Sequence, residues 1–310
     1  MHLLCKVLKM SLLAVGTIAF DSIETLTNSR HRILGGSATY FGYAASFFTP
    51  VRLVGIVGKD WPDRYSQLLA ERGIDLSGVV KDETKNSYFW HGRYTPDFQD
   101  RETLACEVQG FDQFVPKLPD HFRDSRFVFL GAASPSVQLR TLEQCNNPGF
   151  VFADTVDMWI ERASGELTQL LRRLNCLLIN DSEARQFTGH RELIQAGKAI
   201  QKLGPKMVII KKGEHGCLLF HEDSVSPCPA FPTDKMIDPT GAGDSFAGGV
   251  LGHLVNRPSI DRRTMVDAIH YGTVVASYTV AGFSLEGLQS IGMAEIEDRR
   301  TEFRKMLLVE

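Results

Sequence analysis

Short apolar runs alternate with amphipathic segments along most of the chain. The runs have the length of single strands and occupy residues 51–58, 126–131, 150–154, 176–180 and 207–211. Strands that are apolar throughout are buried on both faces, as in a parallel sheet whose strands are connected by helices. Apolar residues at helical spacing, for example over 62–73 and 137–144, supply such connections. The pattern predicts an α/β fold with a mostly parallel central sheet.

The last part of the chain is different, because its apolar residues recur at helical spacing with few strand-like runs between them. This pattern predicts helices over 242–255, 263–281 and 293–308. Two earlier segments, 21–34 and 86–109, instead alternate polar and apolar residues, which is typical of strands with one solvated face. We expect them to form a small accessory sheet, a lid over a site, on one large domain that spans residues 11–310.

The first twenty residues are open to two interpretations. Two lysines followed by an apolar run resemble a signal peptide, whereas "SLLAVGTIAF" (11–20) has the length of a buried first strand. The run ends at Asp21, which favours the strand, with residues 1–10 as an N-terminal extension. No other segment has eighteen uninterrupted apolar residues, so no membrane span is expected.

Composition narrows the partners and the compartment. Hydrophobic residues make up 43% of the chain, charged residues 23%, and the net charge is −3, as in an ordinary soluble domain with no basic field for nucleic acid or an anionic membrane. The six cysteines form no CxxC pair and no metal-like cluster with histidine. Such scattered cysteines are typical of reduced thiols and indicate the cytoplasm.

The stretch "MIDPTGAGDSFAGGVLGHLV" (236–255) carries the clearest chemistry. Pro239 ends any helix that arrives from upstream, and Gly241 and Gly243 would each cost about 1 kcal/mol inside a helix. A helix that begins at Ala242 or Gly243 presents free amides and a partial positive charge to an anion, and glycine lets a phosphate approach. Asp244, in the first turn, is placed to accept a proton from an attacking hydroxyl. This combination suits phosphoryl transfer to an alcohol.

Other glycine motifs do not fit the stretch. No GxxxxGK[ST] string occurs in the chain, and GxGxxG fails because Phe246 occupies the third glycine position. An aspartate that merely supplies negative charge at a helix N-terminus is the structural alternative for Asp244.

"DPTGAGDSFAGG" (238–249) resembles the second signature of the PfkB (ribokinase-like) family of carbohydrate and nucleoside kinases. The resemblance covers the chain from about Ser11 to the C-terminal helix. It implies a three-layer α/β/α domain with a β-sheet lid and transfer of the γ-phosphoryl group of ATP to a hydroxymethyl group. It also implies that Asp244 is the catalytic base and that Gly241, Ala242 and Gly243 form the anion hole.

Two further elements match the family at the nucleotide. Asn180 and Glu183 match its NxxE element, in which the asparagine helps to hold the triphosphate and the glutamate organises Mg²⁺ through water. An N-cap at Asp181 or Ser182 is the structural alternative. In "VIIKKGEHGCLLF" (208–220), the resemblance implies that Lys211, Gly213 and Gly216 line the nucleotide, although the glycines also suit a plain turn between two strands.

The acceptor side is less well matched. Gly35 and Gly36 precede an aromatic-rich helix and resemble the family's first signature, and Asp21 matches an acid that binds sugar hydroxyls; each also fits an ordinary loop or turn. Tyr40 stands where the family commonly has Asn, so one polar contact to the substrate is changed. Asp238 and Thr240 match the residues that coordinate a monovalent cation such as K⁺ in some members, and they equally fit a tight turn.

The sequence thus favours an ATP- and Mg²⁺-dependent kinase that acts on a primary hydroxyl of a small sugar. A nucleoside kinase on the same fold is the first alternative, since lid aromatics can stack on a base, pack the lid or form a homodimer interface. A nucleotide- or sugar-binding pseudokinase is the second alternative. An oxidoreductase is not favoured, because the chain lacks the GxGxxG motif that binds a dinucleotide. The lid aromatics and their neighbouring arginine are Phe89, Trp90, Arg93, Tyr94 and Phe98.

Overall fold

The computed structural model describes residues 11–98 and 100–308, and their strands form two sheets. The larger sheet has nine strands, and the pairing of its neighbours is parallel except where β12 meets β11 and β13. Its order is β13 (Ser224–Cys228), β12 (Cys217–His221), β11 (Met207–Lys211), β10 (Cys176–Asn180), β9 (Phe150–Asp154), β8 (Phe127–Leu130), β1 (Leu12–Val15), β4 (Val51–Gly58) and β5 (Ile74–Asp82). The predicted α/β fold with a mostly parallel central sheet is confirmed.

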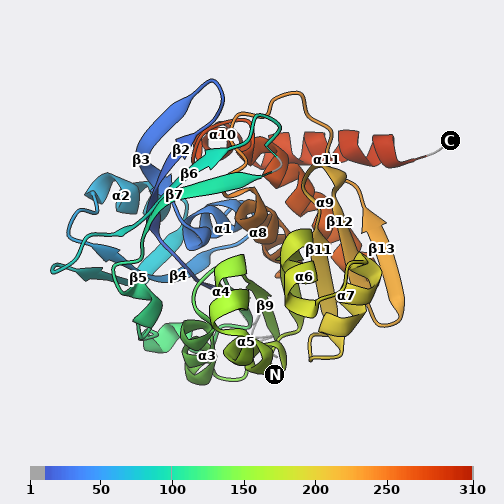
Figure 1. Ribbon diagram of the computed structural model, residues 1–310, viewed down its shortest axis with the longest axis horizontal. Coiled ribbons are helices and arrows are strands. Elements are labelled where there is room, and N and C mark those ends of the chain that lie inside the picture. The colour runs from blue at the N-terminus through green and yellow to red at the C-terminus, as the bar shows by residue number, and fades with distance from the viewer. Residues whose placement is uncertain (1–10, 99, 309–310) are drawn as a thin grey trace, which may run out of the picture.

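Helices cover both faces of this sheet, because successive residues of each strand point to opposite sides. In β1, Leu12 and Ala14 belong to one buried cluster, and Leu13 and Val15 belong to the other. The first cluster packs under α1 (Ser37–Ala45), α2 (Asp63–Glu71), α8 (Ala242–Leu254), α9 (Arg262–Thr279), α10 (Glu286–Gln289) and α11 (Met293–Leu307). The second packs under α3 (Pro135–Gln144), α4 (Asp157–Arg162), α5 (Ser164–Leu171), α6 (Asp181–Thr188) and α7 (Leu193–Gln201). Figure 1 shows the two sets of helices on either side of the sheet.

The first predicted strand is wrong in one respect. The run 11–20 does not form a single strand: it breaks after Val15, and β2 (Ala19–Glu24) continues in the smaller sheet. Gly16 lies at the break, where a β-carbon would stand 2.6 Å from the hydroxyl of Ser37. The close approach of α1 thus turns the chain from one sheet into the other, and Asp21 lies within a strand instead of leaving one. Residues 1–10, expected to be an extension, lie outside the described residues.

The smaller sheet has the order β3 (Ser29–Gly35), β2, β6 (Tyr88–Tyr94) and β7 (Arg101–Glu107). Its strands come from the two segments whose polar and apolar residues alternate. In Figure 1 they lie together at the upper left, beside α1 and α10. One hydrogen bond, 3.0 Å between the hydroxyls of Tyr94 and Thr240, joins β6 to the turn before α8.

The sequence patterns did not predict β5, because its exposed and buried positions do not alternate regularly. Among the described residues, three short 3₁₀ helices complete the fold: η1 (Phe111–Gln113), η2 (Asp120–Phe122) and η3 (Gly213–His215). None of the helices in the described part of the chain combines the length and apolar character needed to cross a bilayer.

Candidate active site

The turn before α8 presents backbone amides to a cavity. Gly241 is the N-cap of the helix with φ 76°, a left-handed conformation, and a β-carbon there would stand 2.4 Å from the Tyr40 ring. Both the backbone conformation and the packing therefore require glycine. Among described residues, the amides of Gly241 and Gly243 have no hydrogen-bond partner, whereas Ala242 N–H donates to the Pro239 carbonyl at 3.1 Å. The predicted anion hole thus contains two free amides, not three.

Asp244 lies in the first turn of α8, and it is partly buried in the wall of the cavity. Loss of solvent around the carboxylate and the nearby Asp154 raise its pKa to about 7, while the positive charge of Lys211 acts in the opposite direction. A base with a pKa near neutrality is matched to proton transfer at physiological pH. Its position and pKa suit the predicted role.

Lys211, at the end of β11, is held by an acid that the sequence analysis did not identify. Its ammonium donates to the carboxylate of Asp154 at 2.8 Å, and both residues line the cavity. Asp154 ends β9, which neighbours β10, and β10 pairs with β11. The sequence did contain a signal for Asp154: three adjacent parallel strands each end in a polar residue, and those ends meet at one edge of the sheet.

Asn180 and Glu183 form a capping box at the start of α6. The Asn180 side chain accepts from the Glu183 amide at 2.7 Å, and Glu183 accepts from the Asn180 amide at 2.9 Å. Asn180 is therefore the N-cap, in place of the Asp181 or Ser182 alternative. Burial raises the pKa of Glu183 to about 7, and both side chains line the cavity. A single carboxylate beside a phosphate site suits Mg²⁺, which retains several waters and uses few protein ligands.

Asp21 lies on β2 against the glycine pair. A β-carbon on Gly35 would stand 2.0 Å from its carboxylate, so Gly35 leaves the space that Asp21 fills. Gly36 has φ 95° and is the N-cap of α1. Burial, together with the charges of Asp238 and Asp244, raises the pKa of Asp21 to about 8, against a hydrogen bond from the Gly36 amide. Asp21 and Gly36 line the cavity, and Gly35 lies behind them.

Asp238 is fully buried behind the turn. One carboxylate oxygen accepts from the Thr240 amide at 2.9 Å, and the other has no partner among described residues. Burial raises its pKa to about 6. The hydroxyl of Tyr40 is likewise buried without a described partner. An unpaired oxygen on a buried carboxylate suits a bound cation.

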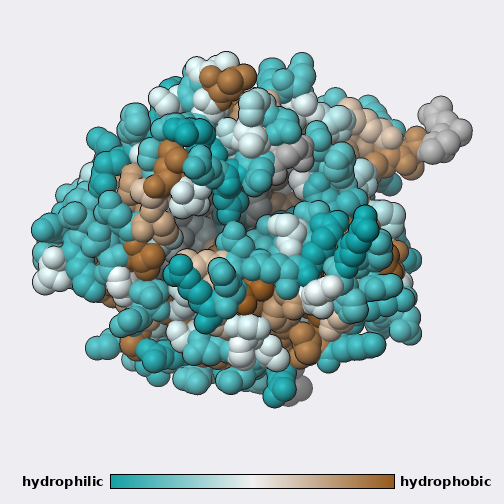
Figure 2. Space-filling model, viewed as in Figure 1, coloured by the Kyte–Doolittle hydropathy of each residue, from teal (hydrophilic) through white to brown (hydrophobic). Residues whose placement is uncertain are grey.

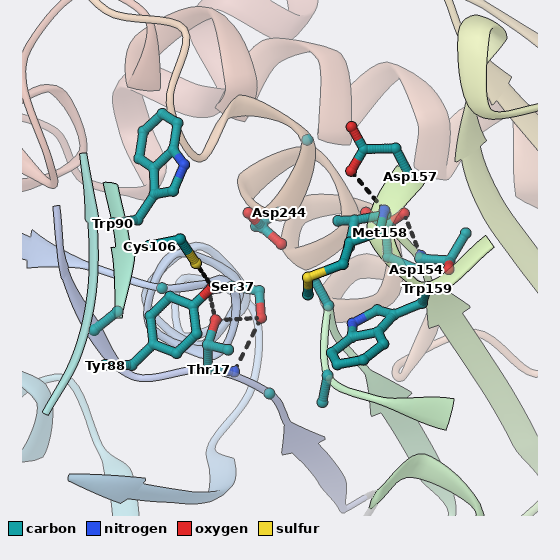
Figure 3. Close-up of a pocket in the computed structure, with 18 of the residues that line it drawn as sticks. Thr17, Ser37, Tyr88, Trp90, Cys106, Asp154, Asp157, Met158, Trp159 and Asp244 are labelled. Atoms are coloured by element: carbon teal, nitrogen blue, oxygen red, sulfur yellow. Dashed lines mark hydrogen bonds between the residues drawn. The ribbon is translucent and has the colours of Figure 1, made fainter. Parts of the chain in front are cut away.

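The cavity has a volume of about 870 Å³ and opens between the small sheet and the carboxyl ends of the large-sheet strands. Figure 2 shows the molecular surface hollowed near the middle of this face. In Figure 3, Asp244 lies between Tyr88, Trp90 and Cys106 on one side and Asp157, Met158 and Trp159 on the other. Gly213 and Gly216 do not line the cavity: they have φ 56° and 75° and form the η3 turn at its edge of the sheet.

Sequence reasoning found only part of the aromatic lining of the cavity. Of the named lid residues, Trp90 and Tyr94 line the cavity, whereas Phe89, Arg93 and Phe98 do not. Tyr88 and Cys106, joined by a 3.0 Å hydrogen bond, were not singled out. Met158 and Trp159 come from α4, far away in the sequence. Alternation along β6 gave a weak signal for Tyr88, but the contribution of α4 depends on tertiary packing.

Known proteins resemble this chain over most of its length. Cytidine kinase of Thermococcus kodakarensis is 26% identical over 80% of this chain and 90% of its own. A Burkholderia thailandensis nucleoside kinase solved with inosine shares the fold, with a TM-score of 0.78, 21% identity, and coverage of 94% of this chain and 96% of its own. A putative ribokinase II of E. coli, solved with ATP and Mg²⁺, has a TM-score of 0.77, 16% identity, and coverage of 94% and 99%.

The match to the family itself spans the whole cavity. Residues 11–286 match the pfkB family of carbohydrate kinases, and this range holds both sheets and α8. The matched range includes the turn with the free amides of Gly241 and Gly243, and it includes Asp244. It also includes the strand ends that carry Asp154, Asn180 and Lys211. The chain therefore belongs to the pfkB carbohydrate kinase family.

Proposed function

We propose that this kinase transfers the γ-phosphoryl group of ATP to a primary hydroxyl of a nucleoside. The observation that carries the proposal is the continuity of the cavity. A single space joins Asp244 and the free glycine amides to a section walled by Tyr88, Trp90 and Trp159. Aromatic rings stack on the flat face of a base, which a free sugar lacks.

The relatives support the nucleoside over the small sugar that the sequence favoured. The cytidine kinase covers most of both chains, and a nucleoside kinase of Methanothermobacter thermautotrophicus is also 26% identical, over 77% of this chain and 81% of its own. We therefore take the nucleoside alternative as the main proposal.

Asp244 would take the proton of the acceptor hydroxyl as its oxygen bonds to phosphorus. The amides of Gly241 and Gly243, at the positive end of α8, would donate to the oxygens on which charge accumulates. Lys211 would contribute a point charge held in place by Asp154. The base and the donors belong to the same helix start, so their relative positions are fixed before the substrate arrives.

Glu183 would hold Mg²⁺, through water, beside the triphosphate, and Asn180 would contact the phosphates. The ion, when bound, offsets phosphate charge. Gly213 and Gly216, which do not line the cavity, are assigned to the turn between β11 and β12 and not to the nucleotide. The free oxygen of Asp238, with Thr240, would bind a monovalent cation such as K⁺.

Asp21 and Gly36 would bind the ribose hydroxyls. The carboxyl group of Asp21 can hydrogen-bond to two neighbouring hydroxyls, and the glycine lets the sugar approach the backbone. This arrangement would direct the primary hydroxyl toward Asp244 and the base toward the aromatic wall.

The test is an acceptor screen with the full chain, ATP and Mg²⁺. Cytidine, uridine, adenosine, inosine and guanosine are offered beside ribose and fructose, and both ADP release and product mass are measured. We expect phosphorylation of at least one nucleoside with kcat/KM above that of either sugar. Turnover of free sugars alone would overturn the nucleoside proposal and restore the sugar alternative.

Asp244→Asn is the control for contaminating kinases. It keeps the shape of the side chain and removes the base, so ADP release must fall with it. Release that is equal in wild type and variant belongs to another protein, and a wild type that releases no ADP with any acceptor favours a pseudokinase.

A further inference from the structure

Asp112 brings an unpaired carboxylate to the cavity. It lies in η1, shortly after the last strand of the small sheet, and its half-buried side chain belongs to the cavity lining. Among the described residues this carboxylate has no hydrogen bond and no ion pair, although Arg101 and Arg162 also line the cavity. Asp157, another acid of the lining, instead accepts from the Met158 amide at 2.7 Å. Because a carboxylate only accepts hydrogen bonds, a free one suits a ligand that donates.

The backbone of Asp112 is held by the large domain. The Ser134 hydroxyl donates to the Asp112 carbonyl at 2.8 Å, and Ser134 is the N-cap of α3. The Gln113 amide donates to the Gly110 carbonyl at 3.2 Å, which closes the turn. The position of Asp112 is thus fixed from α3 as well as from the small sheet. A side chain on a held backbone can discriminate between ligands that differ in one polar group.

The carboxylate lies close to the section of the cavity that is walled by aromatic rings. Burial raises the pKa of the Tyr88 hydroxyl, as do its hydrogen bond to Cys106 and the charges of nearby acids, among them Asp112. Such an effect requires a short distance, because the field of a charge weakens with separation. Val108 and Phe114, on either side of Asp112 in the sequence, also line the cavity. The free acceptor is therefore set among rings and apolar side chains.

The other polar groups of the small-sheet wall are already bonded to one another. A 3.0 Å hydrogen bond joins the Tyr88 hydroxyl to the sulfur of Cys106. The indole N–H of Trp90 donates to the Thr103 hydroxyl at 3.2 Å. All four residues line the cavity. A base stacked on these rings therefore has the Asp112 carboxylate as a free partner for a donor on its edge.

We propose that Asp112 selects acceptor bases that carry an exocyclic amino group, by accepting a hydrogen bond from that group. Cytosine and adenine carry such an amine, and a carboxylate is a matching acceptor for it. Uracil and hypoxanthine have a carbonyl oxygen at the same ring position, which would face the carboxylate as one acceptor against another. The inference rests on the proposed nucleoside kinase activity and adds the class of base.

The preference arises from pairing. An amine that meets the carboxylate forms a charge-assisted hydrogen bond, whereas a carbonyl at that place leaves two acceptors unpaired. The edge of the base lies away from the hydroxyl that reacts, so the contact is the same before and during phosphoryl transfer. Contacts of this kind change KM and leave kcat nearly unchanged.

The test measures kcat and KM in two acceptor pairs, cytidine with uridine and adenosine with inosine, in which a carbonyl oxygen replaces the amine. We expect the wild type to favour the amine member of the pair that it phosphorylates by at least about tenfold in kcat/KM. Asp112→Asn keeps the shape and adds an amide donor, so the two members should come within about threefold of each other, through KM. Asp157→Asn, the matched control in the same cavity, should keep the wild-type ratio.

Three results overturn the inference while the nucleoside proposal stands: turnover of nucleosides without preference for the amine, a preference that survives in Asp112→Asn, or an equal loss of preference in both variants. Turnover of free sugars alone overturns the nucleoside proposal and this inference together. If no acceptor is turned over, calorimetry with cytidine and uridine decides. Tighter binding of cytidine that is lost in Asp112→Asn supports the contact, and equal affinities in the wild type overturn it.

Discussion

The two walls of the cavity are built in different ways. On the large-sheet side, the ends of adjacent strands carry Asp154, Asn180 and Lys211, which are bonded to their neighbours and set among buried residues. On the small-sheet side, Tyr88 and Trp90 belong to β6, whose residues are half-buried or exposed except for Gly92. The hydroxyl pair of Tyr94 and Thr240 bridges the two sides.

This difference indicates that one wall carries out phosphoryl transfer and the other selects the acceptor. Groups that transfer a phosphoryl must be held within fractions of an ångström, which buried strand ends and a helix start provide. The acceptor can be selected by side chains that make fewer hydrogen bonds to one another, because the shape of the cavity and the area of ring stacking change little when a side chain moves slightly. Substitutions of the phosphoryl-transfer groups on the large-sheet side should therefore change kcat, and those in the acceptor wall, formed by Tyr88, Trp90 and Trp159, should change KM.

The largest effect is expected at Asp244. Asp244→Asn removes the base while keeping the side-chain volume, so kcat should fall by at least about 10²-fold, since a general base contributes about 10² to 10⁴. Steady-state turnover gives the loss, and circular dichroism with a melting curve checks that the fold is intact. Turnover near that of wild type would contradict the assigned role.

Gly241→Ala should follow in size. The β-carbon would collide with the Tyr40 ring at 2.4 Å, and the alanine would have to adopt a left-handed backbone conformation. The turn must therefore shift, and its free amides would no longer point at the phosphoryl oxygens. We expect kcat to fall by about 10²-fold, as when an oxyanion donor is lost.

Gly189→Ala is the matched control for that variant. Gly189 has φ 70° at the end of α6, and a β-carbon there meets nothing within 4 Å. It incurs the same left-handed strain, about 1–2 kcal/mol, without the collision. If both variants lose stability equally and both keep their turnover, the packing of Tyr40 under Gly241 does not position the anion hole.

The sequence predicts the large-sheet side far better than the small-sheet side. Residues 51–58 form a strand with the predicted bounds, and the helix predicted over 242–255 is α8 at 242–254, because a buried strand and an amphipathic helix are each encoded by local periodicity. Asp244 stands in the first helical turn as the spacing requires. Gly16 shows the limit: an apolar run of uniform character divides between two sheets where α1 packs against it.

The acceptor wall depends on contacts between distant segments. Trp159 meets the cavity from α4, and Cys106 gains its position from pairing with Trp90. A short strand with mixed exposure, such as β7, carries no periodic signal that tells which side chain faces the cavity. Asp154 was missed for another reason: its signal in the sequence is only a polar residue at the end of a strand, and its partner Lys211 lies on a strand two places away in the sheet, with the two charged groups 2.8 Å apart.

Trp90→Ala tests the acceptor wall with a smaller effect. Loss of its ring should raise KM for the nucleoside by about tenfold, within the 1–3 kcal/mol typical of stacking on a base, and leave kcat nearly unchanged. Phe89→Ala is the control: Phe89 lies on the same strand, does not line the cavity and packs against the buried cluster. That variant should lower the melting temperature and leave KM unchanged. A fall in kcat without a change in KM in Trp90→Ala would contradict the division between the two walls.

The smallest effect should be a shift of the pH profile. Asp244 acts as a base only when deprotonated, so kcat/KM should rise with pH through its pKa of about 7. Asp154→Asn removes a negative charge that raises this pKa and frees Lys211, which lowers it, so the acidic limb should move to lower pH by up to about one unit. Glu183 moves the same way, because Asp154 also raises its pKa.

Asp157→Asn separates this electrostatic effect from a general disturbance of the cavity. Asp157 lines the same cavity from α4 and is not among the causes that shift the pKa of Asp244. Its removal should leave the acidic limb where the wild type has it. If Asp154→Asn moves the limb upward, or if both variants move it equally, the large-sheet wall does not set the proton affinity of the base through Asp154. The two walls would then differ in rigidity but not in electrostatic function.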